Sequence, residues 1–180
     1  MGESVTQVSA PATRWLDGEQ QRVWREFVAA TGMLNAHLES QLQRDSGMPY
    51  TYYEVLVRLS EATDVTMRMS ELAEACHVSR SRLSHAVAKM EDNGWVRRTS
   101  CPTDKRGAFA TLTRAGLQAL EQAAPGHVES VRGCLFDVLT EDQVAALGEI
   151  SSAIVAGLAA ECATVRELAD EGTEQQKIPE

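Results

Sequence analysis

Apolar positions along the first part of the chain repeat at helical spacing. From about Trp15, six apolar residues fall three or four positions apart, or at sums of these steps. They are Leu16, Val23, Phe27, Leu34, Leu38 and Leu42. Gly47, Met48 and Pro49 interrupt the pattern, because glycine and proline break helices. We therefore expect a long amphipathic helix that stops before Gly47, and a second helix over about 51–62.

Two short helical segments follow, and their starting points are only nine residues apart. Ser70 and Ser79 each precede a short apolar run and carry the kind of side chain that caps a helix N-terminus. Asn93 and Gly94 end the second segment, because both residues readily adopt the left-handed conformation found after a helix. The inward positions of the second segment are Leu83, Val87 and Met90. The pattern predicts a helix from Ser70, a turn at 77–78 and a second helix from Ser79 to about residue 92.

The next segment has the pattern of a hairpin. Residues 95–100 and 108–112 are strand candidates, and the polar stretch 101–107, which contains Pro102 and Gly107, joins them. Thr113 is placed to cap a helix from 114 to about 139, which we expect to kink or split at Pro125. Residues 140–143 form a capping box that opens a last helix. The apolar stripe of that helix is Leu147, Ile150, Ile154, Leu158, Val165 and Leu168.

Two short helices joined by a tight turn and followed by a hairpin are the elements of a winged helix-turn-helix. We therefore predict a mainly α fold with a small β-hairpin wing. Residues 49–113 form the expected DNA-binding domain, and residues 15–48 and 114–170 form the helical regions that flank it. Residues 1–14 and 171–180 are expected to be flexible tails.

Charge is distributed unevenly along the chain. The 180 residues carry a net charge of -9, which by itself argues against a polyanionic partner. Between Arg68 and Arg114, however, nine basic and five acidic residues give +4, whereas the remainder carries 8 basic and 21 acidic residues and is therefore -13. Affinity for phosphate depends on the local field, so this window is a candidate DNA-binding surface.

The second helix of the pair and the hairpin supply the candidate DNA contacts. No acidic residue occurs between Ser79 and Lys89, although a surface helix usually mixes both signs. The candidate contacts of this helix are Ser79, Arg80, Ser81, Arg82, Ser84, His85 and Lys89. Those of the hairpin and its flanks are Arg97, Arg98, Thr103, Asp104, Lys105 and Arg106. Such side chains can bind base edges or phosphates, and an arginine on a stiff loop can enter a narrow minor groove.

These segments resemble one known family. The run from Leu72 through Val78-Ser79-Arg80-Ser81-Arg82-Leu83-Ser84 to Arg98 is similar to the DNA-binding core of MarR-type (multiple antibiotic resistance) regulators. Asp104-Lys105-Arg106, followed by Leu112-Thr113, resembles their wing signature. The resemblance covers about 15–168 and implies that residues 15–48 and 114–170 form a helical dimerisation region. Its first and last helices would build a domain-intertwined homodimer that binds a pseudo-palindromic operator.

The resemblance also implies a role for individual residues. The helix residues Arg80, Ser81, Arg82, Ser84 and His85 would read the major groove. Arg106 would enter the minor groove, and Asp104 would pair with a nearby arginine to brace the wing. Repression, with release by a small aromatic or phenolic ligand bound between the dimerisation helices and the DNA-binding lobe, is a further implication. The candidate ligand contacts are Trp15, Trp24, His37, Tyr52 and Tyr53, although aromatic residues at helical spacing are more often part of a core.

Two alternatives remain open at this point. Cys101, near several arginines of the wing, is a candidate redox-sensitive thiol, although a plain turn residue is the more common case. The chain could also be a helical module that binds protein, but the acid-free helix argues against this. Cys76 is expected to pack inside the helix-turn-helix, and the four scattered cysteines show no metal-binding spacing.

The sequence carries no pattern typical of an enzyme, and no cofactor is expected. It has no nucleophile elbow, zinc-protease motif, phosphate-binding loop or dinucleotide fingerprint. No apolar segment is expected to reach membrane-spanning length, and no signal peptide is recognised at the N-terminus. We therefore expect a cytoplasmic, nucleoid-associated protein that binds double-stranded DNA and no membrane.

Overall fold

The computed structural model describes residues 13–100 and 107–174, with side chains through residue 161. The chain forms two compact units, Met1–Gly126 and His127–Glu180. The first unit contains the first four α-helices, a small sheet and most of the fifth helix, and the second contains the end of the fifth helix and the sixth. As predicted, the described chain is mainly helical, with a β-hairpin between the fourth and fifth helices.

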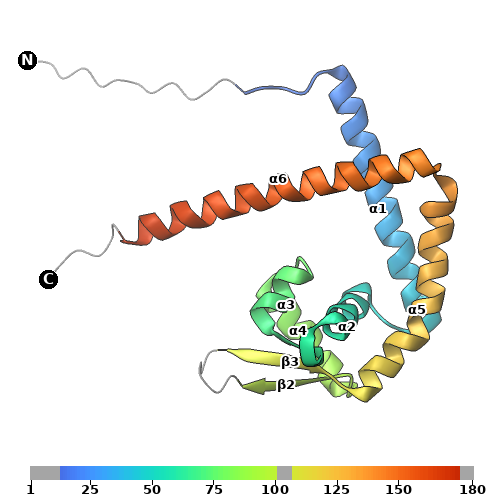
Figure 1. Cartoon of the computed structure of the whole chain (residues 1–180), viewed down its shortest axis with the longest axis vertical. Helices are drawn as coiled ribbons and strands as arrows, with labels where there is room; N and C mark the ends of the chain where they lie inside the picture. The colour runs from blue at the N-terminus through green and yellow to red at the C-terminus, as the bar shows by residue number, and fades with distance from the viewer. Residues whose placement is uncertain (1–12, 101–106, 175–180) are drawn as a thin grey trace, which may run out of the picture. The chain divides into compact units, whose positions relative to one another are not determined.

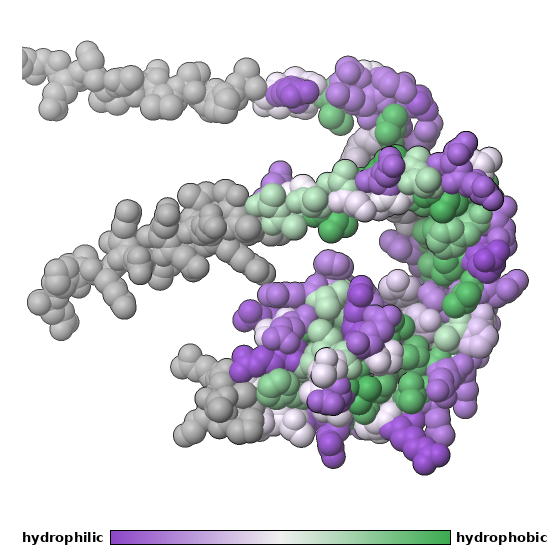
Figure 2. All heavy atoms as spheres, in the orientation of Figure 1, coloured by the Kyte–Doolittle hydropathy of each residue, from purple (hydrophilic) through white to green (hydrophobic). Residues whose placement is uncertain are grey.

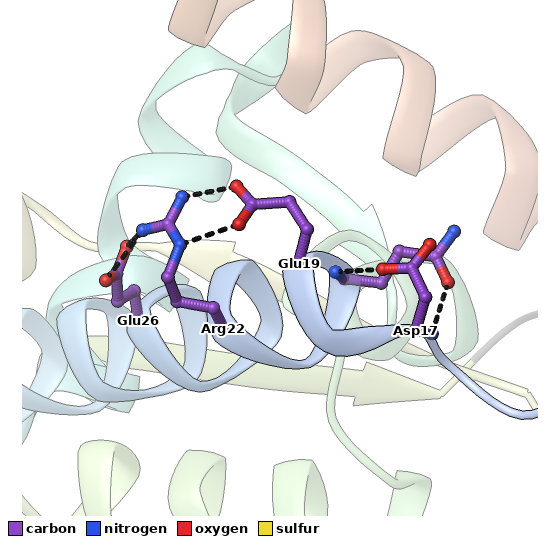
Figure 3. A network of polar contacts seen from close by, with 5 residues as sticks. Asp17, Glu19, Arg22 and Glu26 are labelled. Carbon is purple, nitrogen blue, oxygen red and sulfur yellow. Dashed lines mark hydrogen bonds and ion pairs between the residues drawn. The ribbon is translucent and has the colours of Figure 1, made fainter.

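Helix α1 spans Gly18–Ser46 and begins with a reciprocal cap. The Asp17 carboxylate accepts a hydrogen bond from the backbone N–H of Gln20 at 2.8 Å, and the Gln20 side chain accepts one from the N–H of Asp17 at 3.1 Å (Figure 3). This cap explains why the helix starts after Trp15, where the apolar pattern begins. At the other end Gly47 adopts a left-handed conformation, with φ 62°, and stops the helix where it was predicted to stop.

Helices α2 (Tyr50–Glu61), α3 (Met69–Ala75) and α4 (Arg80–Asp92) pack together beside the strands (Figure 1). They share one apolar core with the end of α1 and the start of α5. Its fully buried large side chains are Leu42, Met48, Val55, Leu56, Leu59, Leu72, Leu83, Val87 and Met90. The inward positions predicted for α4 are all among them, so the core fixes which face of α4 remains outside.

The sheet has three antiparallel strands in the order β1-β3-β2. Strands β2 (Val96–Ser100) and β3 (Ala108–Leu112) form the predicted hairpin, with Val96 opposite Leu112 and Ser100 opposite Ala108. The sequence analysis missed β1 (Thr66–Arg68), because three residues are too few to show strand alternation. Since β1 runs directly into α3, Arg68 occupies the N-cap position, and the prediction that Ser70 caps this helix is wrong.

Helix α5 spans Arg114–Cys134, and the predicted cap is present, because Thr113 Oγ1 accepts a hydrogen bond from the N–H of Gly116 at 3.0 Å. Pro125 lies inside this helix without splitting it, which rules out one of the two predicted outcomes. The predicted extension to residue 139 is also wrong, since α5 ends at Cys134 and a 3₁₀ turn, η2 (Phe136–Val138), follows.

Helix α6 (Glu141–Glu174) begins at the predicted capping box, in which Thr140 and Gln143 bond to each other's backbone N–H groups. Its segment Glu141–Glu161 is long and apolar enough by composition to cross a membrane, which corrects the expectation that no segment reaches that length. Many alanines raise the hydropathy of this segment without adding to its stripe of large apolar residues. Ile150, Ile154, Val155 and Leu158 are exposed, and Figure 2 shows apolar atoms at the surface of this helix.

Candidate nucleic-acid interface

The helix-turn-helix is formed by α3, a turn at 76–79 and α4. The backbone N–H of Val78 donates to the Ala73 carbonyl at 3.0 Å, and that of His77 donates to the Glu74 carbonyl at 3.1 Å. His77 adopts a positive φ of 51°, a conformation that histidine enters more readily than β-branched residues do. The turn thereby reverses the chain within four residues and brings the start of α4 next to α3.

The N-terminus of α4 has the cap that the sequence predicts. Ser79 Oγ accepts a hydrogen bond from the backbone N–H of Arg82 at 3.2 Å. Because the cap sets where the helix begins, it also sets which side chains project from its first turn. All seven predicted contacts on this segment are exposed: Ser79, Arg80, Ser81, Arg82, Ser84, His85 and Lys89.

The wing strand β2 is tied to the last turn of α4 by Glu91. This carboxylate accepts hydrogen bonds from the backbone N–H of Arg98 at 2.9 Å and from Arg98 Nε, forming an ion pair. Arg98 was predicted as a DNA contact, and the structure adds that Glu91 fixes its position. Sequence reasoning missed Glu91, and the seven-residue spacing from helix to strand offers no local signal. Arg97, the neighbouring prediction, is exposed.

The other end of the hairpin is tied to α5 through Thr113. Its hydroxyl donates to the carbonyl oxygen of Gly94 at 2.7 Å, and its N–H donates to that of Trp95 at 3.0 Å. Gly94 and Trp95 connect α4 to β2, so Thr113 fixes the first turn of α5 on this connection. Gly116 makes the close approach possible, because a Cβ at this position would lie 2.8 Å from Leu112 Cδ1 and still closer to the Trp95 carbonyl.

The predicted tip of the wing lies outside the described residues. This applies to Thr103, Asp104, Lys105 and Arg106, and equally to Cys101. Cys76 is buried in the core as expected, and burial raises the pKa of its thiol to about 11. A thiol with this pKa is protonated at neutral pH and is a poor nucleophile. The described residues contain no group of three side chains able to hold a metal ion.

The candidate ligand contacts do not share one environment. Trp15, Trp24 and His37 are exposed before or along α1, and the Trp24 ring centre lies 6.4 Å from that of Phe27. On α2, Tyr52 is half-buried, whereas Tyr53 is buried in the core. Tyr53 therefore already has a structural role, and the three residues of the α1 segment are open to solvent.

Comparison with known proteins identifies the chain's relatives. A model of the MarR family matches residues 46–107. Sco3205 is a MarR family transcriptional regulator from Streptomyces coelicolor whose crystal structure is in complex with DNA. It is 53% identical to this chain with a TM-score of 0.78, and the match covers 81% of this chain and 92% of Sco3205. AbsC, a MarR family regulator from the same organism, is 40% identical with a TM-score of 0.76, covering 82% and 99%.

A curated relative is more distant. The HTH-type transcriptional repressor YetL of Bacillus subtilis is 26% identical over 97 residues, which cover 54% of this chain and 58% of YetL. The chain thus spans less than two thirds of that relative. The chain is 53% identical to Sco3205 over nearly the whole of that protein, and it has a helix-turn-helix, a hairpin and flanking helices. The chain therefore belongs to the MarR family of transcriptional regulators, which are not enzymes.

Proposed function

We propose that the chain is a sequence-specific regulator that binds double-stranded DNA by placing α4 in the major groove. The observation that carries this proposal is the outer face of α4. Its six polar residues from Arg80 to Lys89 are all exposed, and the first acidic side chain on this face, Asp92, comes only in the last turn, where it pairs with Lys89 at 3.4 Å. The preceding turns can approach phosphate without repulsion and offer donors to base edges. Sco3205, the relative at 53% identity, is in complex with DNA.

The wing is proposed to reach the adjacent minor groove. Strands β2 and β3 form a hairpin with five paired positions. Lys105 and Arg106 follow β2 in the sequence and would meet the strong negative potential of a narrow groove. Arg97, exposed on β2, would contact the flanking backbone.

The regulator is proposed to act as a homodimer. Val23, Trp24 and Phe27 on α1, and Ile150 and Ile154 on α6, leave apolar surface exposed in the isolated subunit. A second copy that covers these faces would remove apolar area from water. Two-fold symmetry would present two copies of α4 to half-sites about 34 Å apart, which corresponds to a pseudo-palindromic operator.

Regulation is proposed to be repression that a small aromatic ligand relieves. YetL is named a repressor. Trp15, Trp24 and His37 on the α1 segment and Tyr52 on α2 are the candidate contacts, and a coupling of about 1–3 kcal/mol between ligand and DNA would suffice. The expected location is the cytoplasm, in association with the nucleoid.

The proposal is tested by adding one negative charge to the outer face of α4. The wild-type protein should bind a random-sequence duplex. Its affinity should fall steeply with rising salt concentration when both are plotted as logarithms. Ser81→Asp should abolish most of this binding, because the new carboxylate meets phosphate. Ser40→Asp makes the same change at an exposed position of α1 and should have little effect. If the wild-type protein ignores the duplex at low salt, the proposal fails.

A further inference from the structure

A hollow of about 410 Å³ lies between α4 and the strands of the wing. Arg80 and Ser84 line it from α4, and Arg98 lines it from β2. The rest of the lining comes from the junction of β1 and α3 (Arg68, Met69 and Ser70) and from the start of β3 (Gly107 and Ala108). None of the described lining residues is acidic, so this hollow presents three arginines and two serines to whatever enters it.

The geometry of α4 explains why only some of its side chains reach the hollow. At 3.6 residues per turn, Arg80, Ser84 and Glu91 lie along one flank. The bond between Glu91 and Arg98 shows that this flank faces the wing. Ser81 and His85 lie on the side opposite the buried, inward-facing stripe of Leu83, Val87 and Met90. Arg82 and Lys89 lie on the flank away from the wing.

A duplex imposes its own geometry on these two flanks. One sugar-phosphate strand separates each major groove from the neighbouring minor groove. If α4 enters the major groove and the wing enters the minor groove, that strand must pass between them, which is where the hollow lies. Arg98 bonds to Glu91 through Nε, so its terminal amino groups remain in position to bind a phosphate oxygen.

We propose that the hollow is a binding site for a phosphate of the DNA backbone, formed by Arg80, Ser84 and Arg98. This inference rests on the proposed function and assigns different roles to different residues of α4. Arg80 and Ser84, expected from the sequence to read bases, instead fix the position of the protein on the duplex. Base reading is left to Ser81, His85 and Arg82.

The test compares two duplexes over a range of salt concentrations. One is selected by the wild-type protein from a random pool, and the other is a shuffled duplex of the same composition. Arg80→Gln should weaken binding to both by a similar factor, about tenfold, and reduce the salt slope by about 1. Arg80→Lys should retain the slope. Ser84→Asp, which puts a carboxylate in the hollow, should also weaken binding to both duplexes.

Two matched controls separate this inference from its alternatives. Arg82→Gln, on the opposite flank of the same helix, should change the ratio of the two affinities, and Arg44→Gln on α1 should change neither affinity. The inference is overturned if Arg80→Gln changes the ratio with the salt slope intact, or leaves both unchanged. If the wild-type protein binds no duplex at all, the proposed function itself fails, so the two failures are distinguishable.

Discussion

Gly116 lies where the first turn of α5 meets the connection between α4 and the wing. A Cβ at this position would come 2.8 Å from Leu112 Cδ1 and would press on the Trp95 carbonyl, which is backbone and cannot rotate away. Trp95 in turn accepts the bond from the N–H of Thr113. One small residue therefore determines how closely α5 can approach the end of α4.

We predict that Gly116→Ala destabilises the protein by about 1–3 kcal/mol, since a methyl group forced into a packed site shifts backbone or side chains. Thermal and denaturant unfolding would measure this loss. Gly133→Ala provides the matched control, because it lies in the same helix and a Cβ there meets nothing within 4 Å. The control should be neutral or slightly stabilising. Equal stability of the two variants would mean that the contact at Gly116 is not tight.

The residues that sequence analysis identified correctly act locally. Ser79, Gly47 and Thr113 cap helices through bonds to N–H or carbonyl groups a few positions away, so their neighbours in sequence reveal their roles. Glu91 bonds to Arg98 on β2, and Gly116 lies against the Trp95 carbonyl. Only the folded chain brings these partners together. The prediction for Ser70 failed because β1 extends to Arg68, which therefore occupies the N-cap position of the helix.

Among the elements, α4 and the hairpin were predictable because each has a clear period. Strand β1 was not, since three residues gain stability only by pairing with β3, where Thr66 lies opposite Thr111 and Arg68 opposite Phe109. Pro125 removes one backbone bond from α5, a loss of about 3 kcal/mol in an isolated helix. Leu120 and Ala123 are buried just before it, and their packing helps to keep this part of α5 helical.

The link between α4 and β2 leads to a prediction about Glu91. Glu91→Ala should lower the free energy of unfolding by about 1–2 kcal/mol, because it leaves the N–H of Arg98 without its acceptor and breaks a partly exposed ion pair. Hydrogen exchange should accelerate at the amide of Arg98, while amides that bond β3 to β2 change less.

Graded substitution makes this prediction specific. Glu91→Gln keeps an oxygen acceptor and loses the charge, so its effect should fall between those of wild type and Glu91→Ala. Glu71→Ala removes an exposed acid from α3 and should leave exchange at Arg98 unchanged. Slow exchange at Arg98 in Glu91→Ala would show that the wing does not depend on this bond.

For the whole molecule, the distribution of charge matters more than its sum. The segment from Arg68 to Arg114 carries +4 within a chain of net charge -9. Its described basic residues include Arg80, Arg82 and Lys89 on α4 and Arg97 and Arg98 on β2. An acidic remainder would repel a duplex that approaches elsewhere, so the field favours contact through one face. The same total would be uninformative if the basic residues were scattered.

The apolar surface of α6 is exposed in the isolated subunit. The segment Glu141–Glu161 could by composition lie in a membrane, whereas the proposed function assigns its apolar face to a second copy of the chain. Ile154→Glu places a charge in the stripe formed with Ile150 and Leu158. We predict that this variant sediments as a monomer at concentrations where the wild type is a dimer, because an unpaired charge in an apolar interface is costly.

Loss of the dimer should also be visible in DNA binding. A duplex with two half-sites binds a dimer through two linked contacts, so affinity should fall by about 10²-fold or more in Ile154→Glu, while the weak affinity for a single half-site persists. Ser152→Glu adds the same charge on the side of α6 away from this stripe and should retain both the dimer and the affinity. A dimeric Ile154→Glu variant would exclude this face as the interface, and recovery of the wild-type protein in the membrane fraction would favour the bilayer as the partner of α6.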